Sequence, residues 1–187
     1  MIPAPWPMRV DSLLLREARE TDLGRLLSFR NAPDVNRFMI HTSVEPEMFR
    51  REWLAVPESE TDFSCVAEAE EGVVAMGFLD IVDGTGQPGM PQCTEGHIGY
   101  IVEPRFAGRG YATSIAHGLL GAAFDHLGLR RVTAGCFADN SASTRVLDKA
   151  GMRREQHGIE DSWHAELGWV DGYEYGILAS EWRAQTG

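Results

Sequence analysis

The segment 99–121, which reads GYIVEPRFAGRGYATSIAHGLLG, constrains the fold more than any other part of the chain. Residues 100–102 have the aromatic and β-branched character of a strand, and Pro104 ends that strand because proline cannot donate to a sheet ladder. A turn containing Gly108, Arg109 and Gly110 follows. Apolar residues then recur at helical spacing, at Ile115, Leu119, Leu120 and Phe124. The segment therefore predicts a strand, a glycine turn and a helix.

The turn has the features of an anion site. Unpaired backbone N–H groups and the positive end of the helix dipole attract phosphate, and glycine lets the backbone approach the anion closely. The turn lacks the Lys-Ser/Thr ending of nucleoside-triphosphate loops and the three glycines of the dinucleotide fingerprint. A tight connection without a ligand is the alternative, since glycine is common in turns.

Composition restricts the class of protein and its partners. The chain has 187 residues, 43% hydrophobic and 24% charged, which is typical of one soluble globular domain over 1–187, with an irregular lead-in at 1–11. No apolar run is long enough to cross a membrane, so we expect a cytoplasmic protein without a membrane partner. The net charge of −11 disfavours a nucleic-acid partner. The three cysteines are widely separated, which predicts neither disulfides nor a metal site.

The order of the remaining elements predicts a mixed α/β fold. Residues 63–70 and 73–82 are expected to form a hairpin at Glu71-Gly72, and 83–94 to form a loop. The helix that starts at Tyr111 is expected to end near Gly128. The other expected strands are 12–16, 95–102, 131–137 and an antiparallel pair within 152–182; the other expected helices follow residue 21 and cover 34–39, 45–54 and 142–150.

Three segments resemble one family in order and spacing. IGYIVEPRFAGRGYAT, ADNSASTRVLDKAGM and YGILASEW are similar to the GNAT acyltransferases, most closely to the branch of the Rim-type ribosomal-protein N-terminal acetyltransferases, over about residues 10–183. The resemblance implies an α/β (α+β) GNAT fold, whose central mixed, mostly antiparallel sheet is flanked by helices and splays between strands 4 and 5. Acetyl-CoA would lie in that opening. The implied cofactor-binding residues are Tyr100, Val102, Ala107, Gly108, Arg109, Gly110, Tyr111, Ala112 and Asn140.

The family motif fits the turn in two registers. That motif is Gln or Arg, any two residues, Gly, any one residue, then Gly or Ala. Arg105 with Gly108 and Gly110 satisfies it, whereas the distance from Pro104 and the helix start favours the register of Ala107, Gly110 and Ala112. We prefer the second register, in which the usual Gln or Arg is absent and backbone amides do most of the binding. Arg109 either adds a charged contact to phosphate or is a solvated loop arginine.

Acetyl transfer to an amine needs a base and a proton donor for the leaving thiolate. Glu95 and His97 lie two residues apart on a strand that would line the cleft, so their side chains point to the same face. Either the carboxylate or the imidazole could act as the base, as could a water chain. The tyrosine that many family members use as the acid is replaced by Leu147. In the Rim-type branch a serine serves instead, and the matching residue is Ser143. Direct transfer is the family's usual path, which disfavours Cys136 as a nucleophile.

The acceptor site is expected between the first helices and a late loop, with Asn36, Phe38 and Trp163 as substrate-binding candidates and Asp34 nearby. An acidic cleft would favour a cationic acceptor such as a peptide N-terminus or polyamine. We therefore predict an acetyl-CoA-dependent N-acetyltransferase that acts directly on a primary amine, either a protein N-terminus or a small amine. A non-catalytic acyl-CoA sensor of the same fold is the alternative, and the oligomeric state stays open between monomer and homodimer.

Overall fold

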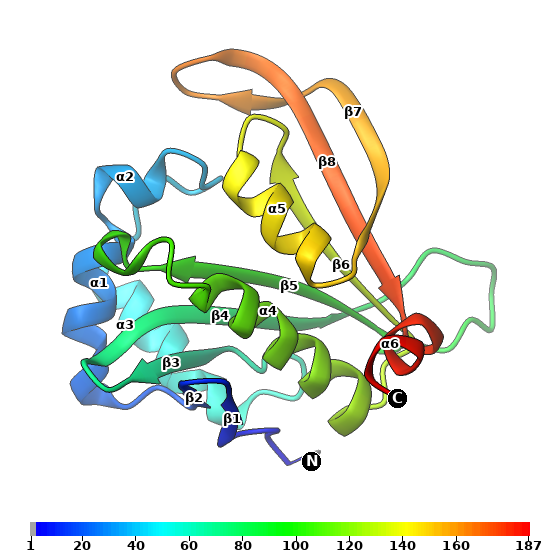
Figure 1. Ribbon diagram of the computed structural model, residues 1–187, viewed down its shortest axis with the longest axis horizontal. Coiled ribbons are helices and arrows are strands. Elements are labelled where there is room, and N and C mark those ends of the chain that lie inside the picture. The colour runs from blue at the N-terminus through cyan, green and yellow to red at the C-terminus, as the bar shows by residue number, and fades with distance from the viewer. Residues whose placement is uncertain (1–2) are drawn as a thin grey trace.

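One mixed sheet organises the chain. The computed structural model describes residues 3–187, whose strands form an eight-stranded sheet in the order β1-β2-β3-β4-β5-β6-β8-β7 (Figure 1). Every neighbouring pair is antiparallel except β5 and β6, which are parallel, so the predicted mixed and mostly antiparallel sheet is confirmed. The strands are β1 (Met8–Val10), β2 (Leu13–Arg16), β3 (Cys65–Ala69), β4 (Gly72–Val82), β5 (Glu95–Val102), β6 (Arg131–Phe137), β7 (Arg153–His164) and β8 (Gly168–Leu178).

The sheet splays open between β5 and β6. These strands pair only over Glu95–His97 with Arg131–Thr133, after which β5 follows β4 and β6 follows β8. The backbone of β5 from Ile98 to Val102 therefore has no strand partner on the β6 side. This is the predicted opening; β1 precedes the first strand expected from the sequence, so the fourth and fifth expected strands are labelled β5 and β6.

Helices cover both faces of the sheet (Figure 1). One face packs against α1 (Leu23–Arg30) and α3 (Pro46–Ala55), and the other packs against α4 (Tyr111–Gly121). The remaining helices are α2 (Pro33–Asn36), α5 (Ser141–Lys149) and α6 (Ala179–Thr186), with a π turn over Ala122–His126 and 3-10 turns at Glu20–Asp22, Val56–Glu58 and Pro104–Phe106.

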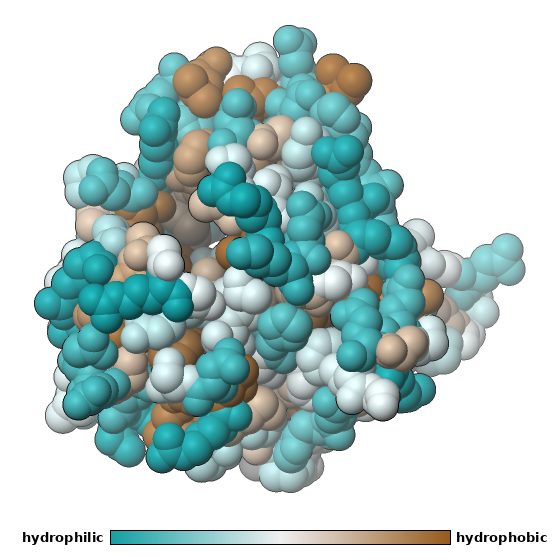
Figure 2. Space-filling view, viewed as in Figure 1, coloured by the Kyte–Doolittle hydropathy of each residue, from teal (hydrophilic) through white to brown (hydrophobic). Residues whose placement is uncertain are grey.

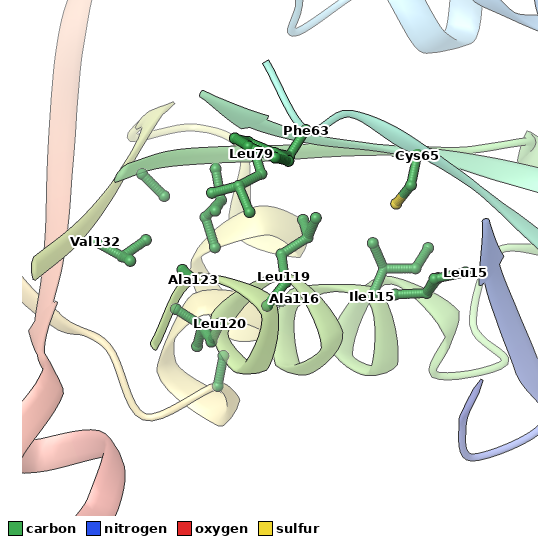
Figure 3. Packing of buried hydrophobic residues seen from close by; sticks show 14 of the residues in the cluster. Leu15, Phe63, Cys65, Leu79, Ile115, Ala116, Leu119, Leu120, Ala123 and Val132 are labelled. Carbon is green, nitrogen blue, oxygen red and sulfur yellow. The ribbon is translucent and has the colours of Figure 1, made fainter. Parts of the chain in front are cut away.

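The larger core lies between α4 and the sheet. Ile115, Leu119 and Leu120 of α4 are fully buried against residues of β2, β3 and β4, including Leu15 and Leu79 (Figure 3). Each such side chain contributes roughly 1.5–3 kcal/mol by leaving water. Gly118 lets α4 approach closely, because a Cβ at this position would collide with Leu15. This packing fixes the beginning of α4 relative to β5.

Two details differ from the sequence expectation. The lead-in is not wholly irregular: Met8–Val10 pairs with β2, because Asp11 takes a left-handed turn conformation (φ 51°) that aspartate tolerates. Helix α6 replaces the end of the expected strand pair, since Glu181 accepts a hydrogen bond from the Leu178 N–H (2.7 Å) and Trp182 is buried. Residues 83–94 form a loop as expected. Among residues 3–187, no helix has the length and apolar character of a membrane span.

Candidate active site

The opening between β5 and β6 leads into a cleft of about 590 Å³. Figure 2 shows this region as a hollow in the surface, with apolar residues inside and hydrophilic side chains on its rims. The walls come from β5, the turn before α4, the α2 segment and α5. Several residues that the sequence assigned to the site do line this cleft: Tyr100, Val102, Ala107, Gly108, Gly110, Tyr111, Ala112, Asn140, Ser143, Phe38 and Asp34.

The turn before α4 forms a cradle of backbone donors. Gly108 and Gly110 have φ values of 78° and 83°, a region that side-chain-bearing residues avoid, and a Cβ at either position would meet open space. The first intrahelical bond runs from the Ser114 N–H to the Gly110 carbonyl (3.1 Å), and across the described chain the N–H groups of 108–113 have no protein acceptor. We call residues 108–113 the cradle. Its unpaired donors and the helix dipole suit a diphosphate.

The start of α4 favours the second motif register. Gly110 is the N-cap and Tyr111 the first helical residue, which puts Ala107 and Ala112 in the cleft wall. Arg105 does not line the cleft: it pairs with Glu103 (2.6 Å) and its guanidinium lies 4.7 Å from the Phe106 ring centroid.

Arg109 is also absent from the residues that line the cleft. Its guanidinium donates to Glu71 in the β3–β4 turn (2.8 Å) and lies 5.0 Å from the Phe106 ring centroid. Of the two roles that the sequence left open for this side chain, the structure shows a loop arginine with a carboxylate partner, while the Arg109 N–H remains one of the cradle donors. Glu71 was missed because hairpin and turn are far apart in sequence.

Two hydroxyl groups meet inside the cleft. The Tyr100 hydroxyl oxygen lies 3.0 Å from Ser143 Oγ, and either group can donate. Asn140 caps α5 by accepting a hydrogen bond from the Ser143 N–H (3.2 Å), which fixes the position of Ser143. Burial raises the pKa of Tyr100 above its usual range, so its hydroxyl stays protonated near neutral pH. The pair is therefore a stable source of hydrogen-bond donors.

Cys136 lies on β6 beside the hydroxyl pair and is half-buried. Burial raises the pKa of its thiol, although a hydrogen bond with Ser143 opposes this effect. A protonated thiol is a poor nucleophile.

His97 lies on the other face of β5. Side chains alternate along a strand, so Tyr100 and Val102 face α4 while His97 and Ile101 face the α1 and α3 side. His97 is exposed, its Nδ1 is 3.0 Å from Thr133 Oγ1, and the two residues form the last pair before β5 and β6 separate. The strand β5 does line the cleft, but His97 is not among the residues of the cleft wall.

Glu95 is an ion-pair partner and not an accessible base. It is buried (8% exposed) and contacts the guanidinium groups of Arg130 and Arg131, the second at 3.5 Å. Its carboxylate oxygens are therefore engaged by two guanidinium groups at a buried position. Glu95 does share a face with His97, as expected, but it joins the closed end of the β5–β6 pair.

The acceptor candidates divide between the cleft and the scaffold. Phe38 lines the cleft, with its ring centroid 5.5 Å from His164 and 6.3 Å from Phe137. Asn36 does not: it is buried and accepts a hydrogen bond from Arg30 (2.5 Å). Trp163 is 61% exposed at the β7–β8 hairpin and packs on Trp169 (5.4 Å between centroids), outside the cleft.

The aromatic side chains packed against Phe38 include His164 (5.5 Å between ring centroids). His164 is buried, and its Nδ1 accepts hydrogen bonds from the N–H groups of Glu166 (3.2 Å) and Leu167 (3.3 Å). The proton therefore resides on Nε2, which has no partner in the described chain. Its edge contact with Phe137 (5.4 Å) shows that this histidine is part of an aromatic wall.

Two cations in the cleft wall were also absent from the predicted site. Arg145 and Lys149 line it from α5, together with Ala142 and Val146. Their spacing of three to four residues on an expected helix was the available signal. For metals, residues 3–187 contain no cluster of three or more His, Cys, Asp or Glu side chains suited to an ion.

Comparison with known proteins agrees with this architecture. Residues 12–153 match the family model described as the acetyltransferase (GNAT) domain. The chain is 30% identical over 155 residues to the uncharacterized N-acetyltransferase YnaD of Bacillus subtilis (strain 168), a match that covers 71% of this chain and 91% of YnaD.

Solved structures share the fold at lower identity. A spermidine N-acetyltransferase from Vibrio cholerae in complex with CoA and spermine superposes with a TM-score of 0.79 at 16% identity, covering 92% of this chain and 98% of that one. RimL, a ribosomal L7/L12 alpha-N-protein acetyltransferase in complex with coenzyme A, superposes with a TM-score of 0.77 at 15% sequence identity. This match covers 92% of this chain and 97% of the RimL chain. The cradle, the splayed sheet and the match over residues 12–153 lead to one conclusion: the chain belongs to the GNAT family and is an acyltransferase that uses acetyl-CoA.

Proposed function

We propose that this protein transfers the acetyl group of acetyl-CoA directly to the nitrogen of a primary amine. The observation that carries the proposal is the Tyr100–Ser143 hydroxyl pair (3.0 Å), which lies in the same cleft as the cradle. The cradle residues would hold the diphosphate, and the unpaired backbone of β5 between Ile98 and Val102 offers donors and acceptors to the pantetheine amides. Bound acetyl-CoA supplies a thioester whose acyl carbon the amine attacks.

Ser143 is the proposed proton donor. Its Oγ–H would donate to the sulfur as the C–S bond breaks, while the Tyr100 hydroxyl donates to Ser143 in return. Asn140 holds Ser143 in place through the helix cap. Cys136 is kept as a thiol by burial, which supports direct transfer over a route through an acyl-cysteine.

His97 is the proposed base. It is exposed at the point where β5 and β6 separate, on the sheet face opposite Tyr100, so the amine would approach from that face. The Nδ1 contact with Thr133 leaves Nε2 available to accept the proton that the amine loses. The burial of Glu95 and its two arginine partners support His97 over Glu95 in this role.

The acceptor is proposed to be cationic before it reacts. Asp34 is the only carboxylate among the lining residues of the cleft that the described chain forms, and it is exposed beside Phe38. A carboxylate next to an aromatic ring suits an ammonium group. A protein N-terminus, as for RimL, and a small amine, as for the spermidine enzyme, both satisfy this chemistry; the three motif segments support the Rim-type branch.

The test combines turnover with cofactor binding. Thiol release is followed with a panel of amines and N-terminal peptides, and CoA affinity is measured by calorimetry. We expect Ser143→Ala and His97→Gln to lose at least about tenfold in kcat while keeping CoA affinity. Tyr100→Phe should lower kcat too, and Tyr100→Phe with Ser143→Ala should be no worse than Ser143→Ala alone.

Ser141→Ala is the matched control, because Ser141 lies on α5 outside the cleft lining. Full turnover in Ser143→Ala would contradict the assignment of the acid. CoA binding without turnover on any amine would favour the sensing module.

A further inference from the structure

A stripe of α5 faces the cleft and carries two cations. Ala142, Arg145, Val146 and Lys149 line the cavity, so they share one side of the helix, and Arg145 and Lys149 are one turn apart. Helix α5 contacts α4, whose N-terminus provides the cradle, and lies between α4 and β7 in Figure 1. The cations therefore border the space next to the cradle.

Neither cation has an acidic partner among residues 3–187. The two arginines nearest the cradle in sequence differ, because Arg105 pairs with Glu103 and Arg109 pairs with Glu71. The chain has a net charge of −11, so a multiply charged anion is repelled by the protein as a whole. Arg145 and Lys149 are the cations of the cleft wall that remain free to bind one.

Coenzyme A presents phosphate at two places. The diphosphate bridges the nucleotide and the pantetheine, and a further monoester phosphate is attached to the ribose 3′ oxygen. Neutral backbone donors at a helix N-terminus suit the diphosphate. A monoester phosphate carries a charge near −2 at neutral pH and forms its strongest contacts with arginine and lysine.

Position along α5 also separates the two ends of the cofactor. Ser143, near the helix start, meets Tyr100 where the thioester is proposed to react. Lys149 is the last residue of α5, about 9 Å further along the helix axis at 1.5 Å per residue. The cationic end of α5 is therefore displaced from the reacting end of the cleft, as the nucleotide is displaced from the thiol.

We infer that Arg145 and Lys149 bind the 3′-phosphate of coenzyme A, and that the protein thereby distinguishes coenzyme A from dephospho-coenzyme A. This rests on cofactor binding in the cleft, and it adds a specificity determinant on α5 to the cradle. In the competing arrangement, Arg145 and Lys149 contact the diphosphate. Coenzyme A and dephospho-coenzyme A both contain the diphosphate and differ only in the 3′-phosphate, so comparing their affinities separates the two arrangements.

The experiment measures the Kd of CoA and of dephospho-CoA by calorimetry for the wild type, Arg145→Ala, Lys149→Ala and the double variant. The wild type is expected to prefer CoA by about 10–100-fold, the effect of one or two charged hydrogen bonds. The double variant should lose most of this preference by weakening CoA binding, with the Kd of dephospho-CoA changed less than about threefold. Arg183→Ala, which removes an exposed cation of α6, controls for net charge.

Two results overturn the inference. An unchanged preference in the double variant would place the 3′-phosphate elsewhere, and equal weakening of both ligands would place the cations on the diphosphate. A wild type that binds neither ligand would instead overturn the cleft assignment that underlies the proposed function. Thermal unfolding of each variant verifies that these exposed substitutions leave the fold intact.

Discussion

Substitution of Gly110 by alanine tests whether the cradle binds the cofactor. Gly110 is the N-cap of α4 with φ 83°, and an added Cβ would meet no protein atom within 4 Å. The change therefore adds a methyl group to the cradle without a collision in the core. Any loss of cofactor affinity must come from the cradle itself or from backbone strain.

The backbone strain that alanine introduces at Gly110 can be estimated, and Gly128→Ala serves as its control. Alanine in the left-handed region costs about 1–2 kcal/mol, partly offset by about 0.4–1 kcal/mol from the reduced entropy of the unfolded chain. The net loss of about 1 kcal/mol corresponds to roughly 2–4 °C in Tm for a chain of this size. Gly128 has φ 69°, equally open surroundings and a position after the π turn, away from the cleft, so Gly128→Ala should cost the same.

Binding should separate the two variants. Loss of one charge-assisted hydrogen bond to a phosphate costs about 1.5–3 kcal/mol, which weakens CoA about 10–100-fold. We expect this loss in Gly110→Ala and wild-type affinity in Gly128→Ala, measured by calorimetry alongside thermal unfolding. Equal CoA affinity in the two variants would refute the reasoning, whether both bind normally or both bind weakly.

Two further predictions concern residues that the structure assigns to the scaffold. Asn36→Ala should lower the free energy of unfolding by roughly 1.5–3 kcal/mol, because the buried Arg30 loses a hydrogen-bond acceptor. The KM for acetyl-CoA should stay unchanged. A raised KM for the amine substrate at full stability would instead return Asn36 to the substrate site. Arg131 donates to Glu155 (3.0 Å) and holds its pKa below the ordinary 4.5, so this carboxylate stabilises the protein above about pH 4.5 and that contribution is lost as the pH falls through the folded-state pKa. Glu155→Gln should therefore destabilise the protein by about 1 kcal/mol near neutral pH in urea titrations, and the difference from wild type should shrink toward pH 3; a difference independent of pH would contradict this.

Short sequence patterns predicted the parts of the site that depend on backbone conformation. Gly108 and Gly110 predicted a turn at positive φ before a helix, and Asn140 with Ser143 predicted a capped helix start; both depend on residues a few positions apart. The hairpin at Glu71-Gly72 is of the same kind, with Gly72 at φ 100°. Short-range patterns of this type do not require knowledge of the rest of the fold.

Long-range pairing decided the partners of charged and polar side chains. Nothing near Glu95 in sequence shows that Arg130 and Arg131 will pair with it across β5 and β6. Arg30 is only six residues from Asn36, but the burial of this arginine, which makes the Asn36 amide a structural partner, follows from the packing of α1 and α2. The same holds for Trp163, whose neighbour is Trp169 on the opposite strand of a hairpin that extends away from the cleft.

The sequence alone determined the strand, glycine turn and helix of residues 99–121, and with them the unpaired backbone donors of the cradle, because glycine conformation and helix polarity are local properties. Only the tertiary structure decided which side chains reach the cleft. The divergence of β5 from β6 opens the cleft beside Tyr100, and the packing of α5 brings Ser143, Arg145 and Lys149 to that opening. Strand register and helix packing join residues distant in sequence, and these contacts depend on the whole fold.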